Sequence, residues 1–313
     1  MNFLIGIKSS FFALVFLSIA IHSDQVFATD WSEHNELVSC KTGQANMSDA
    51  AIGNEHSKPF SYTSSDNPPH SGCYATPTGY EITLYKIGMC TSDPFHLTDA
   101  DVSFSDSSCT WTMESENGTS VDIASTLNQS IALPSAAIRP PNGTYSHFVM
   151  VMANHINLKG SYTTNDATNG GTFFTKQSPN PASTNSPGLF DKTLTSAQFF
   201  KHEFDQYGFN PGSPCKFSYQ RTISTGNNQG LVRAVIANDS LTTLSTCSSP
   251  TRVVGAFKPT STLEINDSTN GLEIQFNVTG AGLWVEGGGS GDPTYQPNWA
   301  YAGDFVPVFT KIN

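Results

Sequence analysis

Residues 144–153, TYSHFVMVMA, decide the fold class of this chain. Side chains of an extended strand alternate between its two faces. Here both sets are apolar: Phe148, Met150 and Met152 on one face, and Tyr145, Val149 and Val151 on the other. A strand that is apolar on both faces is typical of the middle of a layered structure, where it is covered from both sides. The turn signal PPNG at residues 140–143 introduces it.

Further strand-like segments occur on both sides of this central one. They are short, rich in β-branched or aromatic residues, and separated by polar turns. The segments are residues 80–90, 121–124, 216–223, 231–237, 252–257, 271–278, 283–285 and 305–310. Residues 271–278 show the clearest alternation, with Leu272, Ile274, Phe276 and Val278 facing one way. Many short strands with polar turns predict an all-β protein built as an antiparallel β-sandwich.

A large insertion interrupts the strand pattern at about residues 160–250. Residues 165–188 are dominated by Asn, Thr, Ser, Gly and Pro, which predicts a long surface excursion broken only by GTFFTK. One short helix is expected from Thr195 to about residue 207. The sequence Thr195-Ser196-Ala197-Gln198 has the form of a capping box, and Gly208 and Pro211 are stop signals. The insertion is therefore expected to be loop-rich, with one helix.

The order of these segments resembles a family of bacterial extracytoplasmic domains of unknown function. The matching residues are Val121-Asp122-Ile123, Leu133-Pro134, Gly143-Thr144-Tyr145 and, more loosely, residues 272–278. The match covers about residues 80–158 and 262–309. The resemblance implies an immunoglobulin- or transthyretin-like β-sandwich. The family has no established activity, so the resemblance implies no function.

The N-terminal residues have the pattern of a secretory signal peptide. Lys8 precedes an apolar run at residues 9–21, and Val26-Phe27-Ala28 fits the recognition site of a signal peptidase, which predicts cleavage after Ala28. The run is shorter than the ~20 residues that a membrane-spanning helix needs, although an uncleaved anchor is the alternative. No later segment is apolar enough to span a membrane. Residues 29–79 have little periodicity and predict an irregular arm, followed by the β-sandwich domain at residues 80–313.

The composition indicates a secreted, periplasmic or cell-surface protein. Only 13% of the residues are charged, and the formal net charge is −11, so nucleic acids and anionic lipids are excluded as partners by repulsion. Six cysteines follow the predicted cleavage site, which indicates disulfides. Fifteen pairings are possible. Sequential pairing is the hypothesis: Cys40 with Cys73, Cys90 with Cys109, and Cys215 with Cys247. The alternative, a zinc site, lacks the close spacing that its ligands need.

An acidic cluster is the one candidate metal site. Asp99, Asp101 and Asp106 lie close together in the chain, and Ca²⁺ is bound by carboxylate and carbonyl oxygens. The alternative is a solvated turn, because the order of the residues matches no known calcium loop. No other cofactor is expected.

Aromatic residues near the C-terminus are the candidate binding site. They surround the Gly-rich residues 287–291 and comprise Trp284, Tyr295, Trp299 and Tyr301. Aromatic rings with nearby amides stack on sugars or form protein contact surfaces, so a glycan or another surface protein is the expected partner. The alternative is that these rings pack the edge of the sandwich. The oligomeric state stays open.

Motifs for catalysis are absent from the sequence. It has no Gly-x-Ser-x-Gly elbow, no phosphate-binding Gly loop and no His-Glu-x-x-His zinc motif. His202-Glu203 is interpreted as a solvated face of the expected helix, and His147 as a hydrogen-bonded packing residue. The leading hypothesis is a non-enzymatic exported binding or adhesion module. The alternatives are a structural subunit of an extracellular assembly and a hydrolase whose scattered carboxylates converge only in the fold.

Overall fold

A computed structural model describes most of the chain from residue 71 onward. The described residues are 4–7, 31–33, 71–97, 102–125, 131–132, 138–165, 167–168, 170–178, 188–204, 218–223, 229–244, 250–287, 296–303 and 306–312. Over these ranges every regular element is a β-strand and most pairings are antiparallel, which confirms the all-β class. The same ranges contain no helix that is long and apolar enough to cross a membrane.

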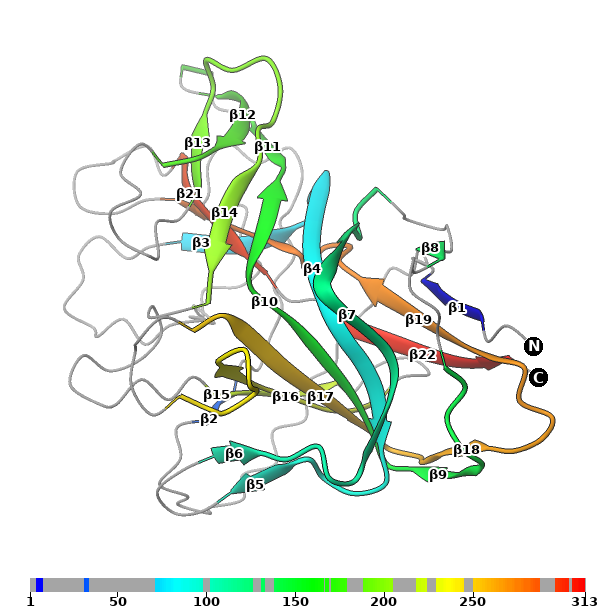
Figure 1. The fold of residues 1–313 in the computed structure, drawn as a ribbon. Helices are drawn as coiled ribbons and strands as arrows, with labels where there is room; N and C mark the ends of the chain where they lie inside the picture. Colours follow the sequence, from blue (N-terminus) through cyan, green and yellow to red (C-terminus); the bar gives the residue numbers. More distant parts are fainter. Residues whose placement is uncertain are drawn as a thin grey trace.

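The largest sheet has eight strands (Figure 1). In order they are β2 (Trp31–Glu33), β15 (Ser218–Ile223), β16 (Gly230–Ala237), β17 (Arg252–Pro259), β10 (His147–Lys159), β4 (Gly79–Cys90) and β7 (Cys109–Asp122), with β14 (Phe200–Glu203) pairing beside β10. The strand expected to be central is indeed central, because β10 pairs with β4 along one edge and with β17 and then β14 along the other.

Two further sheets and two small strand pairs complete the fold. The six-stranded sheet has the order β11 (Ser161–Thr164), β12 (Gly171–Lys176), β13 (Gly188–Asp191), β21 (Pro297–Ala302), β20 (Leu283–Gly287) and β3 (Ser71–Ala75). The four-stranded sheet has the order β22 (Val306–Ile312), β19 (Gly271–Asn277), β1 (Leu4–Ile7) and β8 (Ile131–Ala132). The small pairs are β5 (Phe95–Leu97) with β6 (Val102–Phe104), and β9 (Gly143–Tyr145) with β18 (Leu263–Ile265).

One apolar core joins the three large sheets. Met152 comes from the eight-stranded sheet, Val285 from the six-stranded sheet and Phe276 from the four-stranded sheet, and each is at most 2% exposed. Burial of apolar surface from all three sheets in one cluster is the main driving force for their association. Packing of several sheets around one core is compatible with the expected β-sandwich, but the sandwich and its immunoglobulin- or transthyretin-like topology stay predictions.

A second, smaller core covers the opposite face of the eight-stranded sheet. Val149 and Val151 of β10 pack there against Val235 of β16, and Phe95 and Val102 of the β5–β6 pair close the cluster. The residues of β10 with the other parity, such as Met152, enter the large core. Both faces of β10 are therefore covered, as the sequence of residues 144–153 predicts.

The chain passes from one sheet to another at Gly160. The strand β10 ends at Lys159 and β11 of the six-stranded sheet begins at Ser161. The Gly160 amide donates to the Thr175 hydroxyl at 2.9 Å, and the Thr175 amide donates back to the Gly160 carbonyl at 3.0 Å. A Cβ atom at Gly160 would lie 2.5 Å from Cδ2 of Leu283, so a larger residue here would force the buried Leu283 side chain to move.

The short helix expected from Thr195 does not form over the described residues. Residues 195–199 are irregular, and β14 follows at Phe200–Glu203, with residues 205–207 outside the described ranges. Phe200 is 1% exposed whereas Lys201 is exposed, which is the alternation of a strand. The edge of β10 beyond the end of β17 supplies the backbone partners, so tertiary pairing overrides the local capping signal. The described residues between 160 and 250 supply β11 to β16.

The disulfide predicted between Cys90 and Cys109 is confirmed. The two residues lie directly opposite each other where β4 pairs with β7, and their Cα atoms are 3.9 Å apart. Cys73 is also disulfide-bonded, to a partner outside the described residues. The predicted pairs Cys40–Cys73 and Cys215–Cys247 therefore stay predictions.

Candidate functional site

Three of the four aromatic residues singled out in the sequence meet on one sheet surface. Trp284 on β20 pairs directly with Tyr301 on β21, and Glu286 pairs with Trp299 two residues further along. On the other side of β20, Trp284 pairs with Tyr74 of β3, and the two rings meet edge to face with centroids 4.7 Å apart. We call Tyr74, Trp284, Trp299 and Tyr301 the aromatic face. Tyr295 lies outside the described residues.

The local sequence of β20 explains why these rings share one surface. In LWVEG, Leu283 and Val285 alternate with Trp284 and Glu286, and both aliphatic residues belong to the large core. The aromatic face is therefore the surface of the six-stranded sheet that points away from this core. Glu286 adds a carboxylate to it that is 6% exposed.

The rings of the aromatic face differ in exposure. Tyr74 and Trp284 are each 6% exposed, whereas Trp299 and Tyr301 are half-buried. The indole Nε1 of Trp284 is buried, and among the described residues no acceptor lies within hydrogen-bonding distance of it. Buried indole N–H groups usually have a partner, so this donor is an exception among the described residues. Two buried rings thus support two rings that remain partly accessible.

His202 borders the aromatic face. Its Nδ1 accepts a hydrogen bond from the backbone N–H of Ala302 at 3.0 Å, and its ring centroid lies 5.9 Å from that of Tyr301. Burial lowers the pKa of His202 to about 4. The ring is therefore neutral at pH 7 with its proton on Nε2. The interpretation of His202 as part of a solvated helix face is wrong, because the residue lies on β14 between two sheets.

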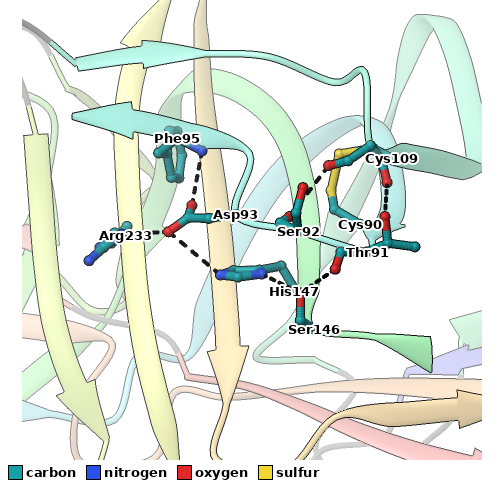
Figure 2. A network of polar contacts seen from close by, with 10 residues as sticks. Cys90, Thr91, Ser92, Asp93, Phe95, Cys109, Ser146, His147 and Arg233 are labelled. Carbon is teal, nitrogen blue, oxygen red and sulfur yellow. Dashed lines mark hydrogen bonds and ion pairs between the residues drawn. A yellow bond between two sulfur atoms is a disulfide. The ribbon is translucent and has the colours of Figure 1, made fainter. Parts of the chain in front are cut away.

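A second polar cluster lies beside the small core (Figure 2). Asp93, in the turn after β4, accepts a hydrogen bond from the Phe95 amide at 3.0 Å and pairs with Nη1 of Arg233 on β16 at 2.8 Å. The same carboxylate lies 3.8 Å from Nε2 of His147, the first residue of β10. We call Asp93, His147 and Arg233 the Asp93 cluster. The cluster connects the start of β5 to β10 and to β16 of the eight-stranded sheet.

Ser146 extends the Asp93 cluster into a Ser–His–Asp series. The Ser146 hydroxyl lies 2.9 Å from Nδ1 of His147 and 3.0 Å from the Thr91 carbonyl, to which it donates. A nucleophilic triad needs hydrogen bonds along the whole series, whereas the 3.8 Å between His147 and Asp93 is too long for one. These contacts hold the turn after β4 against the start of β10 and against β16. Burial, followed by Lys258 and Arg233, lowers the pKa of His147, and Asp93 opposes this shift.

The predicted calcium site is only partly described. Asp99 and Asp101 lie outside the described residues. The Asp106 carboxylate accepts a hydrogen bond from Nε1 of Trp111 at 3.2 Å, so it already has a structural partner. Among the described residues, no three His, Cys, Asp or Glu side chains are placed to hold a metal ion together. Calcium binding by this segment stays a prediction.

Several site residues are not apparent from the sequence. Tyr74, Asp93 and Arg233 have no motif around them, and 140 residues separate Asp93 from Arg233. Only the apolar neighbours of His147 indicated that it packs inside the protein, and that interpretation agrees with its 5% exposure. No model of a protein family, no curated protein and no solved structure matches the chain, and the resemblance to the bacterial extracytoplasmic family stays a prediction.

Proposed function

We propose that this chain is an exported, non-enzymatic binding protein that holds its ligand on the aromatic face. The observation that carries the proposal is the placement of Trp299 and Tyr301 at alternate positions of β21, half-buried and on one surface. Trp284 and Tyr74 lie beside them and are almost fully buried, so the platform is rigid. Rings held in place by packing lose little conformational entropy when they contact a ligand.

A glycan is the ligand class that this surface fits best. The flat faces of aromatic rings accept the C–H surface of a sugar, and sugar hydroxyls need both donors and acceptors. Trp284 and Glu286 lie on the same surface but are each only 6% exposed, so the half-buried rings of Trp299 and Tyr301 carry the proposed contact. A protein partner is the other possibility for this surface, and the experiment below distinguishes the two.

An exported location agrees with the Cys90–Cys109 disulfide, because disulfides persist in oxidising compartments. We propose that the protein acts outside the cytoplasm, as a secreted, periplasmic or surface protein. Only 13% of the residues are charged, so most polar side chains are neutral ones that suit hydrogen bonding to saccharides, and the net charge of −11 favours neutral over anionic saccharides.

The test is a glycan array followed by calorimetry with the strongest binder. The variants Trp299→Ala and Tyr301→Ala are expected to weaken binding at least tenfold, which corresponds to about 1.4 kcal/mol. Trp111→Ala is the matched control, because Trp111 is also half-buried but lies on β7 beside Asp106. Binding by none of the glycans, or equal losses in all three variants, would contradict the glycan proposal. Capture of a protein that depends on Trp299 would replace it.

A further inference from the structure

A bulge in β7, the outermost strand of the eight-stranded sheet beside β4, contains Asn117. On either side of the bulge, the opposed residues of β4 and β7 are Leu84 with Thr119 and Lys86 with Glu114. Residues 115–118 of β7 therefore face only Tyr85 of β4, and extra residues of this kind leave the ladder and bend the strand. Gly118 has a φ of 75°, a conformation that favours glycine, so the chain turns next to Asn117.

The side-chain amide of Asn117 is accessible in the folded protein. It is exposed, and within the part of the chain that the structure describes no hydrogen bond or ion pair involves it. Asn117 begins the sequence Asn117-Gly118-Thr119, which has the Asn-x-Thr form that N-linked glycosylation requires. A glycan is bulky and hydrophilic, so it must stand in solvent once the chain has folded. Asn117 meets this requirement, because attachment to its side chain breaks no described contact.

The same tripeptide occurs at Asn142-Gly143-Thr144, in different surroundings. Nδ2 of Asn142 donates to Oδ1 of Asp267 at 2.6 Å, and Oδ1 of Asn142 accepts a hydrogen bond from Nη2 of Arg139 at 2.7 Å. Arg139 also donates to the Thr269 carbonyl, so the Asn142 amide belongs to a network that joins two distant segments. A glycan on Nδ2 of Asn142 would disturb this network. Because the two sites share their local sequence, their surroundings decide between them.

The remaining sequons within the described ranges also differ from Asn117. They begin at Asn238, Asn266 and Asn277. Oδ1 of Asn238 accepts a hydrogen bond from the Ser240 amide at 3.0 Å, and Oδ1 of Asn266 accepts one from the Ser268 amide at 3.1 Å. Both side chains therefore fold back onto their own backbone. Asn277 lies within β19.

We propose that the exported protein carries a covalent N-linked oligosaccharide on Asn117. The donor is an oligosaccharide joined to a lipid through a diphosphate. Nδ2 of Asn117 forms a bond to the anomeric carbon of the sugar, and the bond from that carbon to the diphosphate oxygen breaks. The lipid diphosphate leaves with the electron pair, and one amide proton passes to a basic group of the transferase. This proposal shares only export with the proposed function, because β7 and the aromatic face belong to different sheets.

The experiment expresses the full chain, with its own N-terminal residues, in a secreting eukaryotic host that performs N-linked glycosylation. The secreted protein is treated with peptide-N-glycosidase in heavy-oxygen water and mapped by mass spectrometry. The enzyme converts each glycosylated Asn to Asp, and the heavy oxygen distinguishes this Asp from the product of spontaneous deamidation. Labelled Asp is expected at position 117 in most molecules, and unaltered Asn at position 142.

Variants of the sequon test whether the modification follows its chemistry. Thr119→Ser keeps the hydroxyl and should retain the glycan, whereas Thr119→Ala should lose it. Asn117→Gln should also lose the glycan and still be secreted. The matched control is Asn142→Gln, which removes the other Asn-Gly-Thr sequon and should leave the glycan at position 117 unchanged.

Secretion of a protein with unaltered Asn117 would overturn the proposal, as would equal occupancy of positions 117 and 142 or a glycan retained in Thr119→Ala. Failure of the chain to leave the host cells would overturn export, and with it the proposed function as well. Secreted protein that binds sugars through Trp299 but carries no glycan at Asn117 would overturn this inference alone.

Discussion

The imidazole of His202 and the backbone of Ala302 are joined by a hydrogen bond of 3.0 Å that runs from one sheet to another. His202 lies on β14 of the eight-stranded sheet, and Ala302 ends β21 of the six-stranded sheet. The bond requires an unprotonated Nδ1 because the amide is the donor. A change in the protonation of one histidine therefore acts directly on the contact between the two layers.

The first prediction is that acid destabilises the protein. The pKa of His202 is about 4 in the folded state, below its ordinary 6.5, and burial also lowers the pKa of His147 and His155. At a pH between the folded-state pKa and the ordinary pKa of such a histidine, the unfolded chain binds more protons than the folded one. Stability should therefore be complete above pH 6.5 and fall as the pH drops towards 4. Each histidine should contribute at most about 1.4 kcal/mol per pH unit. Urea unfolding at several pH values measures this slope.

The variant His202→Asn separates the contribution of His202 from the others. The Asn amide oxygen can accept the Ala302 bond, yet it cannot be protonated. The slope between pH 6.5 and 4 should become shallower, with little loss of stability at pH 7.5. His96→Asn is the control, because His96 is exposed on β5. An unchanged slope in His202→Asn would show that His202 does not titrate in this range.

The second prediction concerns the Asp93 cluster. Asp93→Ala removes the hydrogen bond to the Phe95 amide and leaves Arg233 without this carboxylate, and should cost about 1–2 kcal/mol of unfolding free energy. Asp93→Asn can keep the bond to Phe95 and should cost less. The control is Glu114→Ala, which removes the ion pair between Glu114 and Lys86. The Glu114 side chain is 57% exposed, so this variant should cost under about 1 kcal/mol. Equal losses in Asp93→Ala and Glu114→Ala would contradict the prediction.

The third prediction concerns the Cys90–Cys109 disulfide. The bond closes a loop with a sequence separation of 19, for which chain entropy predicts about 3 kcal/mol of stabilisation. The double variant Cys90→Ala with Cys109→Ala should lose most of this amount in denaturant unfolding. Peptide mapping without reductant should recover the two cysteines in one cross-linked fragment of the unaltered protein. Recovery of Cys90 linked to any other cysteine would refute the pairing.

The fourth prediction concerns the glycine between β10 and β11. Gly160→Ala would place a methyl group 2.5 Å from Cδ2 of Leu283 and should destabilise the protein by about 1–3 kcal/mol. The control is Gly143→Ala in β9, where the nearest atom is 3.9 Å from the new Cβ. Thermal unfolding of both variants should lower the melting temperature much more for Gly160→Ala. Similar shifts would mean that the Leu283 side chain moves aside to accept the methyl group.

The sequence predicted those features that depend on local pattern. The apolar alternation of residues 144–153 and 271–278 indicated a central strand and a core strand, and both are present as β10 and β19. The pattern failed at Thr195, because the backbone partners that β10 offers to residues 200–203 are distant in the sequence. The Asp93 cluster was unpredictable for the same reason, since pairing of strands far apart in the chain brings Arg233 to Asp93.

The passage of the chain through Gly160 also has a mechanical consequence. The strand β10 of one layer continues into β11 of the other through the single residue Gly160, so this passage contains no loop that could act as a hinge. A pulling force on a ligand held at the aromatic face would be carried through β11 into β10 and the strands beside it. A load applied at the aromatic face should therefore reach the eight-stranded sheet directly through this passage.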